Sequence, residues 1–94
     1  AETVLMGKLV DAADRPLSNT AVAFNWPSNN VGGVEIGEEL LARTGSDGRF
    51  VVCSLPGGSL VRVKAELAGM WVDLFEEPMP PGEIVYRRVM IPTR

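Results

Sequence analysis

Apolar and polar residues alternate along most of this chain with the period of two that is typical of β-strands. In Leu60–Leu67, every second residue from Val61 onward is apolar and the residues between them are charged. The pattern predicts seven strands: Thr3–Asp11, Thr20–Trp26, Glu39–Thr44, Arg49–Ser54, Leu60–Leu67, Met70–Glu76 and Ile84–Ile91. No segment has the 3.6-residue period and length of an ordinary helix.

The segments between the predicted strands contain residues that favour turns. Asp47-Gly48 lies between two β-prone segments and predicts a tight hairpin, because glycine adopts the positive φ that such a turn requires. Pro78, Pro80 and Pro81 predict a stiff connector. The segment Ser28–Gly37 has no regular pattern and is expected to be a long loop, with or without a short edge strand inside it.

Seven short strands in 94 residues predict an all-β, seven-stranded antiparallel Greek-key β-sandwich. Ten glycines and seven prolines, placed mostly between the apolar segments, agree with many strands joined by turns. The length fits one domain covering residues 1–94, and the chain is expected to have been excised from a longer protein because it starts directly in a strand.

The charge distribution argues against nucleic acid as a partner, and the length of the apolar runs argues against a membrane. The chain has a formal net charge of −3. Its nine basic residues are scattered along the sequence, and Arg87-Arg88 is the densest pair. A nucleic-acid-binding surface requires a basic cluster that follows the phosphates, so no nucleic-acid partner is expected. The apolar runs are far shorter than the roughly 20 residues of a membrane span, so no membrane insertion by this domain is expected.

The side chains offer little for catalysis or metal binding. The chain has no histidine, which excludes a Ser-His-Asp or Cys-His arrangement. Cys53 is the only cysteine and has no basic neighbour in sequence that would activate its thiol. Asp11, Asp14 and Asp47 are too irregularly spaced for a calcium loop. We therefore predict no catalytic residue, no metal site and no cofactor.

Several short motifs together resemble a known family. Gly7-Lys8-Leu9-Val10-Asp11, followed by Asp14-Arg15-Pro16-Leu17 and Thr20-Ala21-Val22, resembles the opening of carboxypeptidase regulatory-like domains. Ala42-Arg43-Thr44-Gly45-Ser46-Asp47-Gly48-Arg49-Phe50 and Leu55-Pro56-Gly57-Gly58 resemble the hairpin and closing turn of that family. The resemblance covers Leu5 to about Ala65 and implies a transthyretin-like (prealbumin-like, Ig-like) sandwich. It also implies an exported bacterial protein, located in the periplasm, at the cell surface or outside the cell.

A candidate ligand or partner surface consists of Trp26, Trp71 and Tyr86, together with Asn29 and Asn30 in the predicted loop. Exposed aromatic rings could stack on a sugar. The alternative places Trp26 and either Trp71 or Phe75 in the core, with Trp71 and Phe75 expected to share one face of their strand. Polar residues on a long loop suit contact with a partner.

Two functions remain open at this point. The first is a non-catalytic accessory or structural domain that spaces neighbouring domains or mediates protein interaction. The alternative is a module that binds carbohydrate or peptide through the aromatic residues or an exposed sheet edge.

Overall fold

The computed structural model describes residues 2–31 and 34–91, with only the backbone described for 28–31 and 34–36. These residues form seven strands and no helix, so the all-β prediction is confirmed. The strands are β1 (Glu2–Asp11), β2 (Ala21–Val31), β3 (Val34–Arg43), β4 (Arg49–Pro56), β5 (Leu60–Leu67), β6 (Met70–Pro78) and β7 (Ile84–Ile91).

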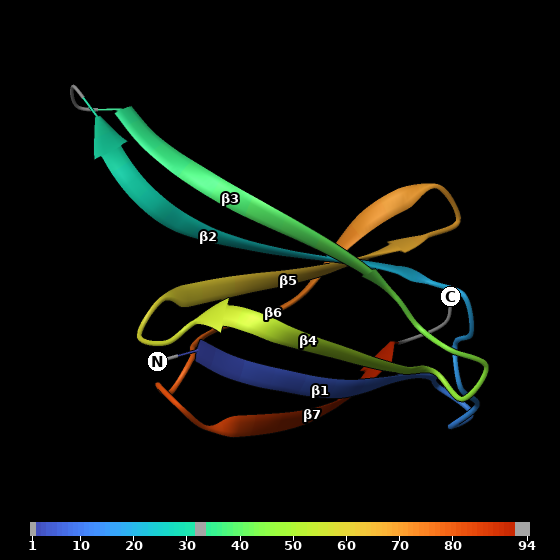
Figure 1. The fold of residues 1–94 in the computed structure, drawn as a ribbon. Helices are drawn as coiled ribbons and strands as arrows, with labels where there is room; N and C mark the ends of the chain where they lie inside the picture. Colours follow the sequence, from blue (N-terminus) through green and yellow to red (C-terminus); the bar gives the residue numbers. More distant parts are fainter. Residues whose placement is uncertain (1, 32–33, 92–94) are drawn as a thin grey trace.

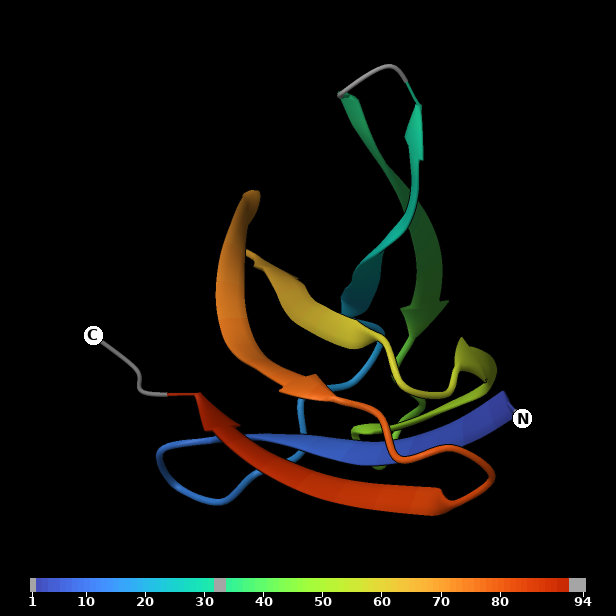
Figure 2. The ribbon, with the colours of Figure 1, turned by 90° about the vertical axis from the view of Figure 1, so that its left-hand side faces the viewer.

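The strands form two sheets that lie one over the other (Figures 1 and 2). The three-stranded sheet has the order β4-β1-β7, and the four-stranded sheet has the order β3-β2-β5-β6. Strands β1 and β2 each have two neighbours in their sheets, and each is paired with a strand distant in sequence. The chain crosses between the sheets after β1, β3, β4 and β6.

The core lies between the sheets and takes alternate residues from each strand. Leu5 and Leu9 on β1, Phe24 on β2 and Val63 on β5 are fully buried there. The rings of Phe24 and Phe50 connect the two sheets, with centroids 5.6 Å apart and planes tilted by 50°. This is a favourable geometry for two aromatic rings.

One strand pair corrects the expectation of a wholly antiparallel sandwich. Strands β1 and β7 are parallel, in register from Val4 opposite Ile84 to Asp11 opposite Ile91. A tight hairpin imposes antiparallel pairing only on strands that it joins directly. Strands β1 and β7 are at opposite ends of the chain, and β7 enters its sheet by a connection from β6 in the other sheet, so nothing local imposes that direction.

The turn at Asp47-Gly48 also differs from the prediction. It is tight, and Gly48 has a φ of 77°, but it joins β3 of one sheet to β4 of the other. Gly45 N–H donates to the Arg49 carbonyl at 2.9 Å, and no β3–β4 ladder follows. The local sequence encodes the turn. The placement of β4 in the other sheet is set by burial of Phe50 against Phe24 of the four-stranded sheet.

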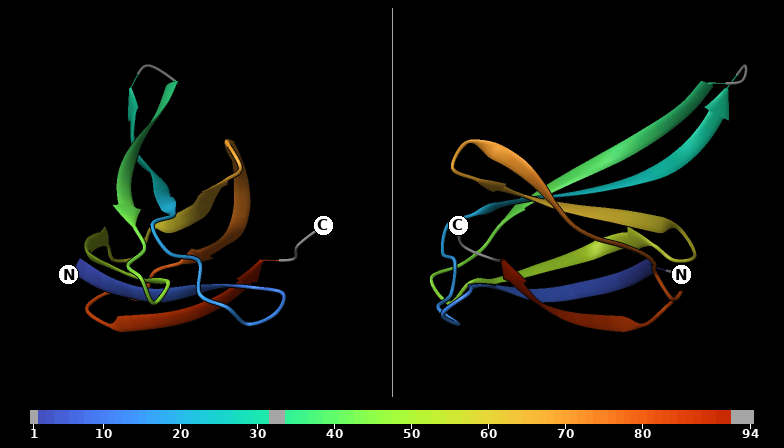
Figure 3. Two further views of the ribbon diagram at one scale, coloured as in Figure 1. Left: turned by 90° about the vertical axis from the view of Figure 1, so that its right-hand side faces the viewer. Right: turned by 180° about the vertical axis from the view of Figure 1, so that it is seen from behind.

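Within the predicted loop at Ser28–Gly37, residues 28–31 and 34–37 are instead the outer part of a long hairpin formed by β2 and β3, while residues 32 and 33 lie outside the described part. The pairing continues from Ala21 opposite Arg43 to Val31 opposite Val34, with a register shift between Pro27 and Asn29. Strand β5 pairs with β2 only as far as Asn25, so the rest of the hairpin projects beyond the two sheets (Figure 3). Proline is tolerated there because β2 has a single neighbouring strand.

Candidate functional site

The outer side of the three-stranded sheet exposes apolar side chains in the middle of all three strands. Met6 on β1 pairs with Val51 on β4 and Tyr86 on β7, and the three are 38%, 52% and 52% exposed. On one side of this row lies Ile84, paired with Val4, and it is 71% exposed. We call this surface the bare face, which also includes Cys53, whereas the exposed Met90 lies beyond it on β7, past Arg88.

The bare face arises because β1 and β7 carry apolar residues on both sides. The inward residues Leu5, Leu9 and Val85 already supply the core. The outward residues are therefore surplus to the packing between the sheets, and no other described strand covers them. Monomeric proteins seldom expose a contiguous apolar patch of several hundred Å², and such patches usually mark interaction surfaces.

Charged residues lie at both ends of the bare face. Lys8 pairs with Arg49 on one side and Arg88 on the other, which gives a cationic row across all three strands. Asp47 lies 3.7 Å from Arg49, and Asp14 forms an ion pair with Arg88. Lys8 forms no ion pair within the described part of the chain. At the opposite end of β1 lies the exposed Glu2, on the same side of the strand.

Trp26, which the sequence placed either on the candidate surface or in the core, lies in the core and is only 9% exposed. It shares the inward side of β2 with Val22 and Phe24, which the alternation of that strand also indicates. The indole has too little exposed surface to serve as a stacking platform, so Trp26 is removed from the candidate surface.

Trp71 is 47% exposed and lies on the outer side of the four-stranded sheet, opposite Glu66. The register of β5 and β6 shifts, so that Val63 faces Phe75 while Lys64 faces Asp73. This irregularity turns Phe75 inward, where it packs against the core. The expectation that Trp71 and Phe75 share a face is therefore wrong, because a bulge changes the alternation and sequence periodicity does not reveal it.

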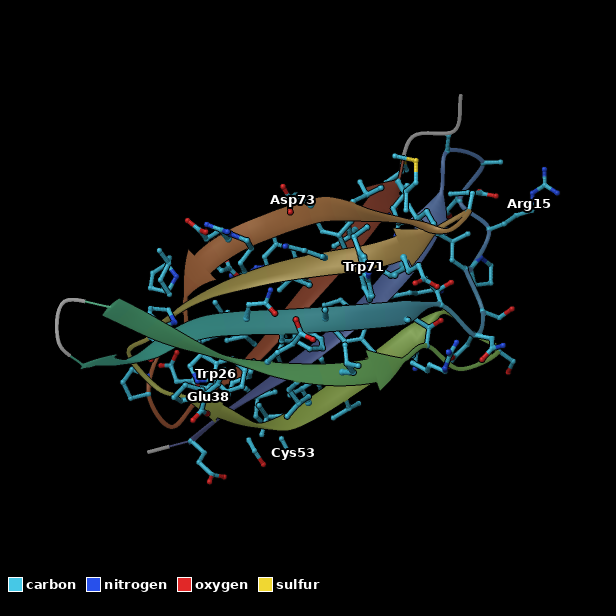
Figure 4. The ribbon with its side chains drawn as sticks, turned by 90° about the horizontal axis from the view of Figure 1, so that it is seen from above. Arg15, Trp26, Glu38, Cys53, Trp71 and Asp73 are labelled. Carbon is cyan, nitrogen blue, oxygen red and sulfur yellow. The ribbon has the colours of Figure 1, made fainter. Side chains whose placement is uncertain are left out.

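The remaining predicted residues do not join Trp71. Tyr86 lies on the bare face, on the opposite sheet from Trp71. The side chains of Asn29 and Asn30 lie outside the part that the structure describes, although their backbones belong to β2. Figure 4 shows Trp26 and Trp71 well apart. No single aromatic platform is formed from these residues.

A shallow cavity of about 210 Å³ lies where β2 separates from β5. It is lined by Asn25, Trp26, Pro27, Leu60, Arg62 and Glu76. Arg62 Nε donates to Glu76 Oε2 at 2.8 Å, and this hydrogen bond and the carboxylate charge raise the pKa of Arg62 above its ordinary value. The pair is solvent-exposed, so its contribution to stability is small.

The acidic residues considered for calcium are used by the loops themselves. Asp11 Oδ1 accepts hydrogen bonds from the Ala13 and Arg15 backbones, both at 2.9 Å. Asp47 Oδ1 accepts one from the Arg49 backbone at 3.1 Å. Within residues 2–31 and 34–91, no three metal-binding side chains come together. The same residues include no helix with the length and apolar character of a membrane span.

Sequence reasoning missed the bare face, although a signal for it exists. Val4 and Met6 make the outward side of β1 apolar, and Ile84, Tyr86 and Met90 do the same for β7. A strand that is apolar on both sides is typically covered on both sides. The signal indicates a further contact, but it does not say which part of the molecule provides it.

The fold and this surface define an all-β protein of two facing sheets, one of which leaves an apolar outer side uncovered. No known protein-family model matches the sequence, and a comparison with curated proteins finds no match.

Proposed function

We propose that this chain is a non-catalytic accessory domain of a larger exported bacterial protein, where it spaces neighbouring domains or docks onto a protein partner. The bare face is the observation that carries the proposal. Met6, Val51 and Tyr86 form an exposed apolar row across three rigid strands, which is a geometry suited to a flat protein surface. No residue has a chemical role in this function.

The family resemblance supports the proposed setting. We propose a transthyretin-like, Greek-key sandwich of the carboxypeptidase regulatory-like kind. The pairing of β1 with β4 and of β2 with β5 supports this, because Greek-key folds bring strands distant in sequence side by side. An exported location and attachment to other domains are part of the same proposal and rest on the resemblance alone.

Carbohydrate binding has less support. It would need several exposed rings on one surface, whereas Trp26 is buried and Trp71 and Tyr86 lie on opposite sheets. Peptide pairing along the β7 edge is also less supported, because this strand has the charged Arg87 on its inward side, held by Glu77 at 2.8 Å. Inward charges on edge strands oppose further pairing.

The proposal is tested with 8-anilinonaphthalene-1-sulfonate, a dye that fluoresces on apolar surfaces. We expect the folded chain at low micromolar concentration to bind the dye, and the double variant Met6→Ser/Tyr86→Ser to lose most of the fluorescence. The matched control is Leu41→Ser, which removes an apolar side chain that is 61% exposed on the other sheet. Equal fluorescence from the double variant and the folded wild type would contradict the docking surface.

A further inference from the structure

The bare face has opposite charges at its two ends. Along β1, the outward residues run from Glu2 through Val4 and Met6 to Lys8. Glu2 and Lys8 are six residues apart, a distance of about 20 Å along a strand, so they do not pair within one molecule. The apolar row of Met6 and its neighbours lies between them.

Such a surface is complementary to itself. Suppose that two copies meet face to face about a twofold axis that lies in the interface and is perpendicular to the strands. Each strand then lies over its equivalent in the other copy and runs in the opposite direction. With the axis level with Leu5, Lys8 of one copy faces Glu2 of the other, and the reverse pair forms by symmetry. In the centre, Tyr86 of one copy faces Ile84 of the other, and Met6 faces Val4.

We propose that the bare face is occupied by a second copy of this chain, forming a twofold symmetric dimer in which Lys8 pairs with Glu2 of the other copy. The inference rests on the proposed function, because it names the partner for the same docking surface. Charge complementarity selects this partner. The opposite relative orientation, with the axis along the strands, would place Lys8 against Lys8 and is disfavoured.

The dimer is expected to be weak. Three strands spaced by about 4.8 Å, with eight residues each at about 3.3 Å, cover an area of roughly 380 Å² per copy. This flat footprint is smaller than the roughly 800 Å² of accessible surface that each partner of a stable complex buries, so we expect a weak, transient dimer. Higher salt should weaken the association, because the two Lys8–Glu2 ion pairs lie at the solvent-exposed rim of the interface.

The test is sedimentation equilibrium of the whole 94-residue chain from 5 μM to 1 mM, with charge-reversed variants. We expect the wild type to approach a saturating dimer. Lys8→Glu and Glu2→Lys should each raise the dissociation constant at least 10-fold, because each places like charges opposite one another twice. The double variant Glu2→Lys/Lys8→Glu should return it to within about threefold of the wild type.

Recovery in the double variant would support the dimer, because the two positions are too far apart to compensate within one copy. Tyr86→Lys provides a second probe, and it should leave the chain folded and monomeric at 1 mM. Far-ultraviolet circular dichroism and thermal unfolding show whether each variant is folded.

A wild type that remains monomeric at 1 mM would overturn the dimer, as would association that neither charge reversal nor Tyr86→Lys changes, or that continues beyond a dimer. A monomer that still binds the dye through Met6 and Tyr86 would leave the docking function standing with a different partner. A monomer whose dye binding is insensitive to those residues would overturn both proposals.

Discussion

The ring of Phe50 on β4 lies directly against Gly7 on β1, in the space that a Cβ at Gly7 would occupy. The two residues pair across the three-stranded sheet with their inward sides facing the core. The absence of a side chain on β1 therefore lets the ring lie flat over the strand and still reach Phe24 on the other sheet. A glycine that would weaken an isolated strand here supports packing between the sheets.

We expect Gly7→Ala to lower the free energy of unfolding by roughly 1–3 kcal/mol, because the new methyl group displaces the Phe50 ring. Urea denaturation measures the change. Gly37→Ala is the control, since the nearest atom to its new methyl group would be the Trp26 carbonyl oxygen at 3.4 Å, an ordinary contact distance. In a Phe50→Leu background the cost of Gly7→Ala should fall by at least about 0.5 kcal/mol. Equal costs in both backgrounds would show that the ring is not the obstacle.

Two glycines with similar backbones allow strain to be separated from steric contact. Gly48 has a φ of 77°, and a Cβ there would lie 2.5 Å from the Leu9 carbonyl oxygen. Gly69 has a φ of 80° and no atom within 4 Å of the same position. We expect Gly69→Ala to cost about 1 kcal/mol from backbone strain alone, and Gly48→Ala to cost at least about 2 kcal/mol more. Similar costs in urea denaturation would contradict this assignment.

The sequence predicts much of this architecture and little of its pairing. The alternation in Leu60–Leu67 places that strand correctly to the residue, because one side is buried and the other is charged. The parallel pairing of β1 with β7 has no local signal, since it depends on contacts between the two ends of the chain. The bulge that separates Trp71 from Phe75 is also invisible to periodicity, because one inserted residue is enough to exchange the two sides.

The hairpin between β5 and β6 contains a residue that can be improved. Ala68 has a φ of 51° and is followed by Gly69 with a φ of 80°, which is the pattern of a two-residue turn with both centres in the left-handed region. Asparagine adopts this conformation more readily than alanine. We expect Ala68→Asn to raise the free energy of unfolding by about 0.5–1 kcal/mol, which in a domain of this size is about 2–8 °C in Tm. An unchanged or lower Tm would contradict the prediction.

The hydroxyl of Thr44 fixes the crossing from β3 to β4. It donates to the Leu17 carbonyl at 2.6 Å and accepts from the Thr20 N–H at 2.8 Å, and the residue is 4% exposed. We expect Thr44→Val to lower the free energy of unfolding by about 1–3 kcal/mol, since two backbone groups lose their partner. Thr44→Ser keeps the hydroxyl and should cost less than about 1 kcal/mol. Equal losses in urea denaturation would assign the effect to packing.

The two tryptophans should differ in fluorescence because their surroundings differ. Trp26 is buried between the sheets, and Trp71 is about half exposed on the outer side of the four-stranded sheet. We expect the Trp71→Phe variant to emit at shorter wavelength than the wild type and to resist acrylamide quenching, because only Trp26 then emits. Trp26→Phe should show the reverse, with emission at longer wavelength and efficient quenching.

The emission of each variant is compared before and after unfolding in urea, which exposes either indole fully and serves as the internal control. Efficient quenching of the folded Trp71→Phe variant would place Trp26 at the surface and return it to a possible ligand-binding role. If that variant instead resists quenching, Trp26 is buried. Trp71 and Tyr86 are then the exposed rings of the candidate surface predicted from the sequence. Since these two lie on opposite sheets, one flat ligand could not contact both, and binding through the bare face would depend on Tyr86 and its apolar neighbours.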